Sequence, residues 1–171
     1  LQALDGDMSI LMAHLREGAA LPDTLAPVPL IAVPTTSGTG SEVTRWATVW
    51  GDDRVKFSLQ HPTLYPSDAI LDPVLCTSMP EDLTLATGLD ALSHAMEAVW
   101  NRNSTPLSDR MATTAIEILF AFLAPTLATP ADVELRRHIQ IASLIAGLAM
   151  GTTQTALAHS ISYPFMAHFG M

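Results

Sequence analysis

The chain has 171 residues, a formal net charge of −9 and a single cysteine; 49% of its residues are hydrophobic and 15% are charged. This composition is typical of a folded globular chain and excludes disorder. The eight Lys and Arg residues are scattered, which excludes nucleic acid and an anionic membrane surface as main partners. Cys76 permits no internal disulfide and suits a reducing compartment, so we expect a cytoplasmic protein.

The first half of the chain carries the patterns of short strands. Residues 30–33, Leu-Ile-Ala-Val, form an apolar run between prolines, which predicts a strand buried on both faces. Residues 43–50 and 55–59 are rich in β-branched and aromatic side chains, and they predict a hairpin whose turn lies at residues 51–53. A last short strand is expected at residues 69–71.

From Pro80 onward the pattern becomes helical. Glu81 and Asp82 suit the positive end of a helix dipole, and two Thr-Pro pairs, at residues 105–106 and 129–130, predict further helix starts. The segments expected to be helical are 9–17, 88–100, 111–123, 133–150 and 155–169. We expect the third of these to end before Pro125. The last is apolar nearly all round, which predicts a place at the centre of a bundle.

Asp90 and His94 lie four residues apart in the segment GLDALSHAMEAVW at residues 88–100. Four residues turn a helix by roughly 400°, so both side chains project from one face and can bind one divalent cation. The alternative is a weak pair on a solvent-facing stripe, which the helix taken alone favours. The helix is amphipathic, with an apolar stripe of Leu89, Leu92, Met96 and Val99 and a polar stripe of Asp90, His94, Glu97 and Asn101.

Two other segments bear on this pair. The loop at residues 34–42 combines glycines with hydroxyl groups, which suits an anion or a nucleotide, although a plain surface turn explains it equally well. His159 lies in an apolar helical segment, where a core histidine is the default interpretation. If His159 faces Asp90 and His94, the three make a two-histidine, one-carboxylate metal site with open positions.

Four segments together resemble the iron-containing alcohol dehydrogenases, a metal-dependent family that includes lactaldehyde reductase and is related to glycerol dehydrogenase and dehydroquinate synthase. They are PTTSGTGSEVT at 34–44, ILDP at 70–73, MPEDLTLATGLDALSHAMEA at 79–98 and HSISYP at 159–164. The resemblance covers nearly everything after Pro29. It implies a dehydroquinate synthase-like architecture, in which an α/β cofactor-domain remnant at residues 1–78 precedes an all-α helical bundle domain at residues 79–171.

The resemblance also implies roles for individual residues. Asp90, His94 and His159 are expected to bind Fe²⁺ or, alternatively, Zn²⁺. The residues expected to contact NAD or NADP are Thr35, Thr36, Ser37, Thr39 and Lys56. The family reaction moves a hydride between a primary alcohol or aldehyde and NAD(P), with the metal polarising the substrate oxygen. A homodimer acting on a small molecule is expected.

Three departures from the family pattern limit what the resemblance implies. The fourth ligand histidine of the family would fall beyond Met171, and the glycine-rich turn for the cofactor pyrophosphate would precede Leu1. Tyr163 stands where many relatives place a second histidine, which leaves the substrate open. We therefore expect this segment alone to be a poor enzyme or none. The alternatives are a metal-independent reductase of the maleylacetate reductase kind, disfavoured by Asp90 and His94, and a non-catalytic helical module.

The remaining chemically active residues are interpreted as structural. His14 and His61 fall in loop or surface contexts and His168 lies near the chain end, while His138 is expected on a solvated face with Arg136 and Arg137. No motif pairs Cys76 with a base, so it is expected to be a small buried residue near the cofactor cleft.

Overall fold

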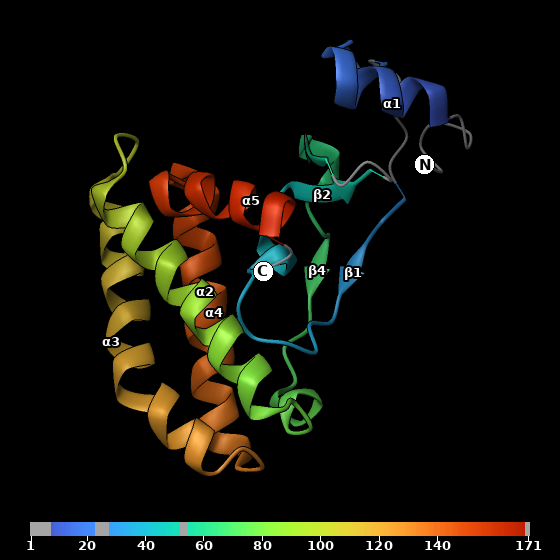
Figure 1. Cartoon of the computed structure of the whole chain (residues 1–171). Coiled ribbons are helices and arrows are strands. Elements are labelled where there is room, and N and C mark those ends of the chain that lie inside the picture. The colour runs from blue at the N-terminus through green and yellow to red at the C-terminus, as the bar shows by residue number, and fades with distance from the viewer. Residues whose placement is uncertain (1–7, 23–27, 52–54, 170–171) are drawn as a thin grey trace.

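Three long helices lie side by side, and short strands flank them (Figure 1). The structure is a computed structural model that describes residues 8–22, 28–51 and 55–169. The helices are α1 (Met8–Glu17), α2 (Glu81–Trp100), α3 (Pro106–Ala128), α4 (Val133–Thr153) and α5 (Leu157–Phe169). The strands are β1 (Ile31–Ala32), β2 (Trp46–Trp50), β3 (Lys56–Gln60) and β4 (Asp68–Ala69). The fold class expected from the sequence, a partial α/β region followed by a helical bundle, is confirmed.

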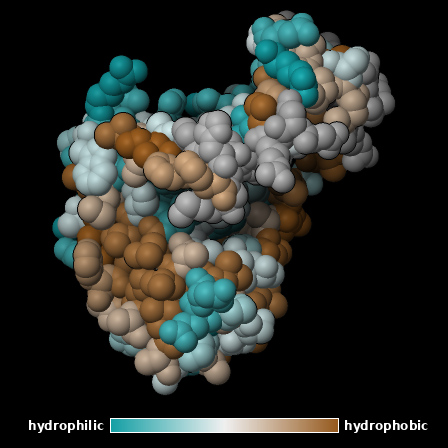
Figure 2. All heavy atoms as spheres, in the orientation of Figure 1, coloured by the Kyte–Doolittle hydropathy of each residue, from teal (hydrophilic) through white to brown (hydrophobic). Residues whose placement is uncertain are grey.

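Small side chains form the core of the bundle. Its buried members are Ala91, Ala95, Ala98, Ala112, Ala115, Leu119, Ile139, Ala142, Ala146 and Ala149. Because alanine occupies the contact faces, the helices can pack at close separation. The expected apolar stripe of α2 is instead largely exposed, with Leu89 49%, Met96 37% and Val99 41% accessible. Figure 2 shows apolar residues gathered on the surface over this part of the bundle. The prediction that the large apolar side chains of α2 are buried is wrong. The face of α2 that carries alanines is buried instead, because alanines permit closer contact between helices.

Two helix boundaries differ from those expected. Thr105 caps α3 as predicted, in a reciprocal pair of hydrogen bonds with Ser108. However, α3 continues through Pro125 to Ala128, because the missing N–H falls in the last turn and costs only the one bond to the Ala121 carbonyl. The second Thr-Pro pair starts no helix, since Asp132 caps α4 through the N–H groups of Glu134 and Leu135.

The position of α5 also differs from the expectation. It lies across one end of the bundle rather than at its centre (Figure 1). Large apolar side chains of α5 within the described residues are accordingly exposed, with Leu157 68%, Ile161 51% and Phe169 70% accessible. Apolar composition alone could not distinguish a central helix from one that contacts the bundle mainly through its first turn.

The strands form two small pairs. β2 and β3 are antiparallel, with Trp46 opposite Gln60, which confirms the predicted hairpin; residues 52 and 53 of the turn expected at 51–53 lie outside the described residues. β1 pairs in parallel with β4, which starts one residue before the strand expected at 69–71. The expectation that β1 is buried on both faces is wrong here: Leu30 and Ile31 are 53% and 56% exposed, because β4 is the neighbour that pairs with β1 among the described residues.

Arg136 is buried rather than solvated, contrary to expectation. Only 1% of it is accessible, and its guanidinium donates to the Thr84 hydroxyl and to the carbonyl oxygens of Met79 and Pro130. Three acceptors compensate the lost hydration of the charge. The guanidinium therefore ties α4 to the start of α2. His138, the neighbour on α4, stacks on Phe122 with 3.8 Å between ring centroids.

One helix, α3, is long and apolar enough to cross a membrane, by length and composition, among the described residues. It packs along both α2 and α4 in this structure. A core helix passes the same test, so this single segment is weak evidence for a membrane span.

Glycines attach the loop at residues 34–42 to the bundle. Gly40 has a φ of 60°, and a Cβ built on it would lie 2.5 Å from the Gly147 Cα of α4. A Cβ on Gly38 would lie 2.6 Å from the Thr87 carbonyl oxygen of α2. Side chains at these positions would push the loop off the helices.

We predict that Gly147→Ala lowers the thermal unfolding temperature. Alanine in a helix is normally favoured over glycine by about 1 kcal/mol. At position 147, however, the new Cβ would meet the Gly40 Cα at 2.7 Å, and overpacking costs about 1–3 kcal/mol. Gly151→Ala is the control in the same helix, because its Cβ would meet nothing nearer than the Val43 oxygen at 3.8 Å. Equal stabilisation by both substitutions, measured by circular dichroism, would contradict this close packing.

Candidate metal centre

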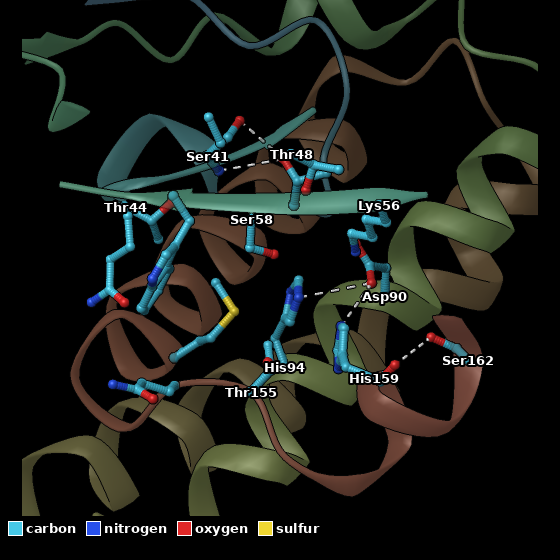
Figure 3. Close-up of a pocket in the computed structure, with 16 residues that line it drawn as sticks. Ser41, Thr44, Thr48, Lys56, Ser58, Asp90, His94, Thr155, His159 and Ser162 are labelled. Atoms are coloured by element: carbon cyan, nitrogen blue, oxygen red, sulfur yellow. Dashed lines mark hydrogen bonds and ion pairs between the residues drawn. The ribbon is translucent and has the colours of Figure 1, made fainter. Parts of the chain in front are cut away.

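Asp90, His94 and His159 meet at one end of the bundle. Asp90 and His94 project from the same face of α2, as their spacing predicted, and the first turn of α5 brings His159 beside them (Figure 3). The Asp90 Oδ1 lies 3.8 Å from His94 Nε2 and 3.4 Å from His159 Nε2. One donor atom from each residue lies within 4.8 Å of the other two. The imidazole rings stack with centroids 4.6 Å apart.

Both imidazoles are oriented through their Nδ1 atoms. His94 Nδ1 lies 3.3 Å from the Gly38 carbonyl oxygen, and His159 Nδ1 lies 2.8 Å from Glu97 Oε2. These oxygens are acceptors, so each Nδ1 donates its proton, and in the neutral form of each ring Nε2 keeps its lone pair toward Asp90. Two Nε2 atoms and one carboxylate oxygen are donors that both Fe²⁺ and Zn²⁺ accept, so the residues present fit a divalent metal.

Burial and charge act differently on the two histidines. Burial lowers the pKa of His94, and the neighbouring Asp90 carboxylate offsets this only in part. The hydrogen bond that the protonated ring of His159 donates from Nε2 to Asp90 raises the pKa of His159 above its ordinary value, and Glu97 adds to this against the effect of burial. The position of His159 is thus one where positive charge is stabilised by two carboxylates. A divalent cation bound there would replace the proton.

A cleft of about 730 Å³ opens over this cluster. Figure 3 shows Lys56 and Ser58 of the β2–β3 hairpin facing the cluster across it, and Thr48 of the same hairpin also lines the cleft. Of the residues expected to contact the cofactor, Thr39 and Lys56 line the cleft together with the three candidate ligands.

The other three expected cofactor residues lie off the cleft lining. Thr35 is exposed and Thr36 is half-buried. Ser37 is buried, with its hydroxyl 3.6 Å from Cys76 Sγ. Cys76 is fully buried, as expected. It contacts Ser37 of the loop at residues 34–42 and does not line the cleft.

Glu97 is the residue that the sequence interpretation missed. The expected polar stripe placed it toward water, but only 1% of it is accessible and it bonds to the first turn of α5. Its spacing was the available signal, because Glu97 lies three residues after His94 and seven after Asp90, on the same helix face.

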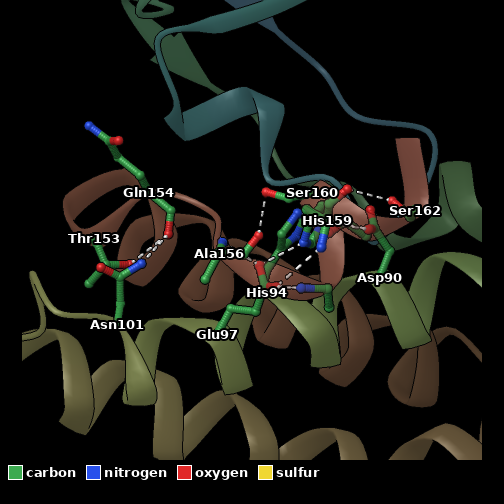
Figure 4. Close-up of polar contacts among 12 residues, drawn as sticks. Asp90, His94, Glu97, Asn101, Thr153, Gln154, Ala156, His159, Ser160 and Ser162 are labelled. Carbon is green, nitrogen blue, oxygen red and sulfur yellow. Dashed lines mark hydrogen bonds and ion pairs between the residues drawn. The ribbon is translucent and has the colours of Figure 1, made fainter. Parts of the chain in front are cut away.

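The connection between α4 and α5 is also held by α2 and the residues that follow it. Asn101 Nδ2 donates to the Gln154 carbonyl at 3.1 Å, and Asn103 Nδ2 donates to the Thr153 carbonyl at 3.2 Å (Figure 4). Gln154 has φ 71° and ψ 169°, a conformation that is normally restricted to glycine. Backbone strain is therefore present at the end of α4, three residues before the start of the helix that carries His159.

The other histidines expected to be structural lie away from the cluster where they are described. His14 Nδ1 bonds to the Ala19 carbonyl, and His61 caps the short 3-10 turn Pro62–Leu64. The side chains of Tyr163 and His168 lie outside the described residues.

Comparisons with known proteins agree on one family. Residues 5–73 match the family model of iron-containing alcohol dehydrogenase, and residues 84–171 match the model of the C-terminal part of the Fe-containing alcohol dehydrogenase family. The chain belongs to the iron-containing alcohol dehydrogenase family.

Individual proteins of known name are similar to this chain. The NAD-dependent methanol dehydrogenase of Bacillus methanolicus is 39% identical over 137 residues, which cover 80% of this chain and 36% of that protein. The phosphonoacetaldehyde reductase of Streptomyces viridochromogenes is 40% identical over 156 residues, covering 90% and 39%. The crystal structure of sulfoacetaldehyde reductase from Bifidobacterium kashiwanohense, in complex with NAD⁺, superposes with a TM-score of 0.89 at 35% identity, covering 94% of this chain and 43% of that one.

These relatives are NAD-dependent or aldehyde-reducing oxidoreductases by name. The present chain spans about two fifths of the length of each. Any activity of a whole protein that contains this sequence is therefore a proposal.

We predict that Gln154→Gly raises the free energy of unfolding by about 1 kcal/mol, because glycine adopts the observed backbone angles without strain. Thr152→Gly is the control within α4, where introducing glycine should destabilise the helix by about 0.3–0.5 kcal/mol. Chemical unfolding of the two variants measures both values. Destabilisation by Gln154→Gly equal to that of the control would show that residue 154 carries no strain.

Proposed function

We propose that this chain carries the metal centre and part of the cofactor site of an NAD(P)-dependent alcohol dehydrogenase. The whole enzyme would transfer a hydride between NAD(P) and a primary alcohol or aldehyde. The observation that carries the proposal is the convergence of Asp90, His94 and His159 on a cleft that Thr39 and Lys56 also line. The names of the relatives support the reaction class.

The three candidate ligands would contribute differently to binding a cation. Asp90 supplies negative charge, and its carboxylate is the part of the cluster most open to the cleft, with 39% of the side chain accessible. His94 and His159 supply neutral Nε2 donors whose rings are fixed by Gly38 and Glu97. When bound there, Fe²⁺ or Zn²⁺ would act as a Lewis acid on the oxygen of the alcohol or aldehyde.

The hairpin and loop would hold the nicotinamide cofactor. Among the expected residues, we propose Thr39 and Lys56 for direct contact, because both line the cleft. We propose that Thr35, Thr36 and Ser37 belong to the cofactor site by shaping the loop that presents Thr39. The buried contact of Ser37 with Cys76 is consistent with a role in fixing the shape of this loop.

The division into two parts is a proposal as well. We place the end of the cofactor-binding part at residue 78 and the start of the metal-binding part at residue 79. The two family models, matched on either side of residues 74–83, support this boundary. Dimeric assembly, a cytoplasmic location and low activity of the segment alone stay predictions.

We predict that the chain binds about one equivalent of Zn²⁺ or Fe²⁺, and that Asp90→Asn loses most of it. The substitution removes the only formal negative charge among the three ligands, while it preserves the shape of the side chain. Metal content of anaerobically loaded protein, measured by mass spectrometry after gel filtration, tests this.

Asp82→Asn is the matched control, because Asp82 is an exposed carboxylate in the first turn of the same helix. It should retain the metal. A wild-type chain that binds no metal would overturn the metal-dependent proposal and favour the metal-independent or non-catalytic alternatives. Full retention of metal by Asp90→Asn would show that the metal is held elsewhere.

A further inference from the structure

Glu97 is a buried carboxylate that accepts hydrogen bonds from N–H groups at the start of α5. Its Oε1 accepts from the backbone N–H groups of Ala158 and His159 at 2.5 and 3.2 Å. Its Oε2 accepts from the Ala156 N–H at 2.7 Å and from His159 Nδ1 at 2.8 Å. Figure 4 shows Glu97 reaching from α2 to these groups, with His159 between it and Asp90.

This arrangement compensates the burial of the charge. A carboxylate removed from water is costly unless its lone pairs are satisfied, and here four N–H groups satisfy them. Three of these are backbone groups at the start of α5, where helix N–H groups have no partner within the helix. Burial alone would raise the pKa of Glu97, but the hydrogen bonds from Ala156 and His159 outweigh it and hold the pKa below its ordinary value.

We propose that Glu97 is a positioning residue for metal binding, which fixes the tautomer of His159 at the same time as it anchors the first turn of α5. The inference deepens the proposed function and rests on it. An ionised carboxylate can only accept hydrogen bonds, so His159 Nδ1 must donate. The lone pair of His159 then lies on Nε2, the atom that faces Asp90 Oδ1 at 3.4 Å.

The two histidines differ in how this control is exerted. His94 is oriented by the backbone carbonyl of Gly38, which no side-chain substitution removes. His159 depends on a side chain, so its tautomer can be changed by mutation. Carboxylate partners of metal-binding histidines generally orient the ring and raise its basicity in this way.

Glu97→Gln is the sharpest test, because the amide replaces one acceptor by a donor. An NH₂ group in place of Oε1 would face two backbone N–H groups, those of Ala158 and His159. In place of Oε2 it would face one, that of Ala156, together with the ring of His159. The orientation with NH₂ in place of Oε2 is less unfavourable, because the NH₂ group then opposes one backbone N–H instead of two. In this orientation His159 Nδ1 must accept a hydrogen bond from the NH₂ group, which moves the ring proton to Nε2 and blocks metal binding there.

The experiment compares Zn²⁺ affinity, by competition with a chromophoric chelator, with the thermal stability of the metal-free protein. Glu97→Gln should lower Zn²⁺ affinity by about 10–100-fold, and by at least as much as Glu97→Ala. Stability should follow the reverse order, since Gln keeps acceptor bonds that Ala loses. A purely structural role would make affinity follow stability, with Ala worse than Gln, and that result would overturn the proposal. So would an unchanged affinity of Glu97→Gln.

Nitrogen-15 NMR of the histidine rings gives a readout that needs no metal. In the metal-free wild-type chain at alkaline pH, His159 should carry its proton on Nδ1, and in Glu97→Gln on Nε2. An unchanged tautomer in the variant would overturn the proposal. If Glu97→Ala does not fold, Glu97→Asp replaces it, and this variant should keep the wild-type tautomer because it keeps the charge.

Two controls separate the possible failures. Glu117→Gln makes the same chemical change at an exposed position of α3 and should alter neither affinity nor tautomer. If the wild-type chain binds no Zn²⁺, the proposed metal-dependent function fails. The NMR result still decides in that case whether Glu97 sets the tautomer of His159.

Discussion

Four hydrogen bonds to the Glu97 carboxylate hold the first turn of α5 against α2, and the position of His159 follows from them. The apolar side chains of α5 that the structure describes are mainly exposed, so this polar contact is the main one that fixes the start of α5 at the site. Asp90, His94 and Glu97 all project from one face of α2. One straight helix thereby supplies two candidate ligands and the group that orients the third.

Close backbone packing provides the other half of the site. The contacts of Gly40 with Gly147 and of Gly38 with Thr87 press the hydroxyl-rich loop against α4 and α2. In this position the Gly38 carbonyl accepts from His94 Nδ1, and the hairpin that follows the loop closes one side of the cleft. The glycines therefore join the part of the chain that is rich in strands to the helix that carries the metal ligands.

The sequence predicted those parts of the site that depend on local spacing. Asp90 and His94 were found because a four-residue interval on a helix is a geometric rule, and the β2–β3 hairpin because its composition is distinctive. Glu97 and Arg136 were misplaced for a common reason. Both are charged residues that a pattern assigns to solvent, and their burial depends on donors or acceptors distant in sequence, such as Ala156 for Glu97 and Thr84 for Arg136. The exposed stripe of α2 shows the same limit, since burial followed the alanines of neighbouring helices and not side-chain size.

The central claim is that Asp90, His94 and His159 bind one divalent metal through a carboxylate oxygen and two Nε2 atoms. Anomalous X-ray scattering from crystals of the Zn²⁺-loaded chain tests it directly. The account predicts one strong peak, about 2.0–2.2 Å from the Asp90 oxygen and from the Nε2 atoms of both histidines. A peak at another group of residues, or one bound through a histidine Nδ1, would contradict it.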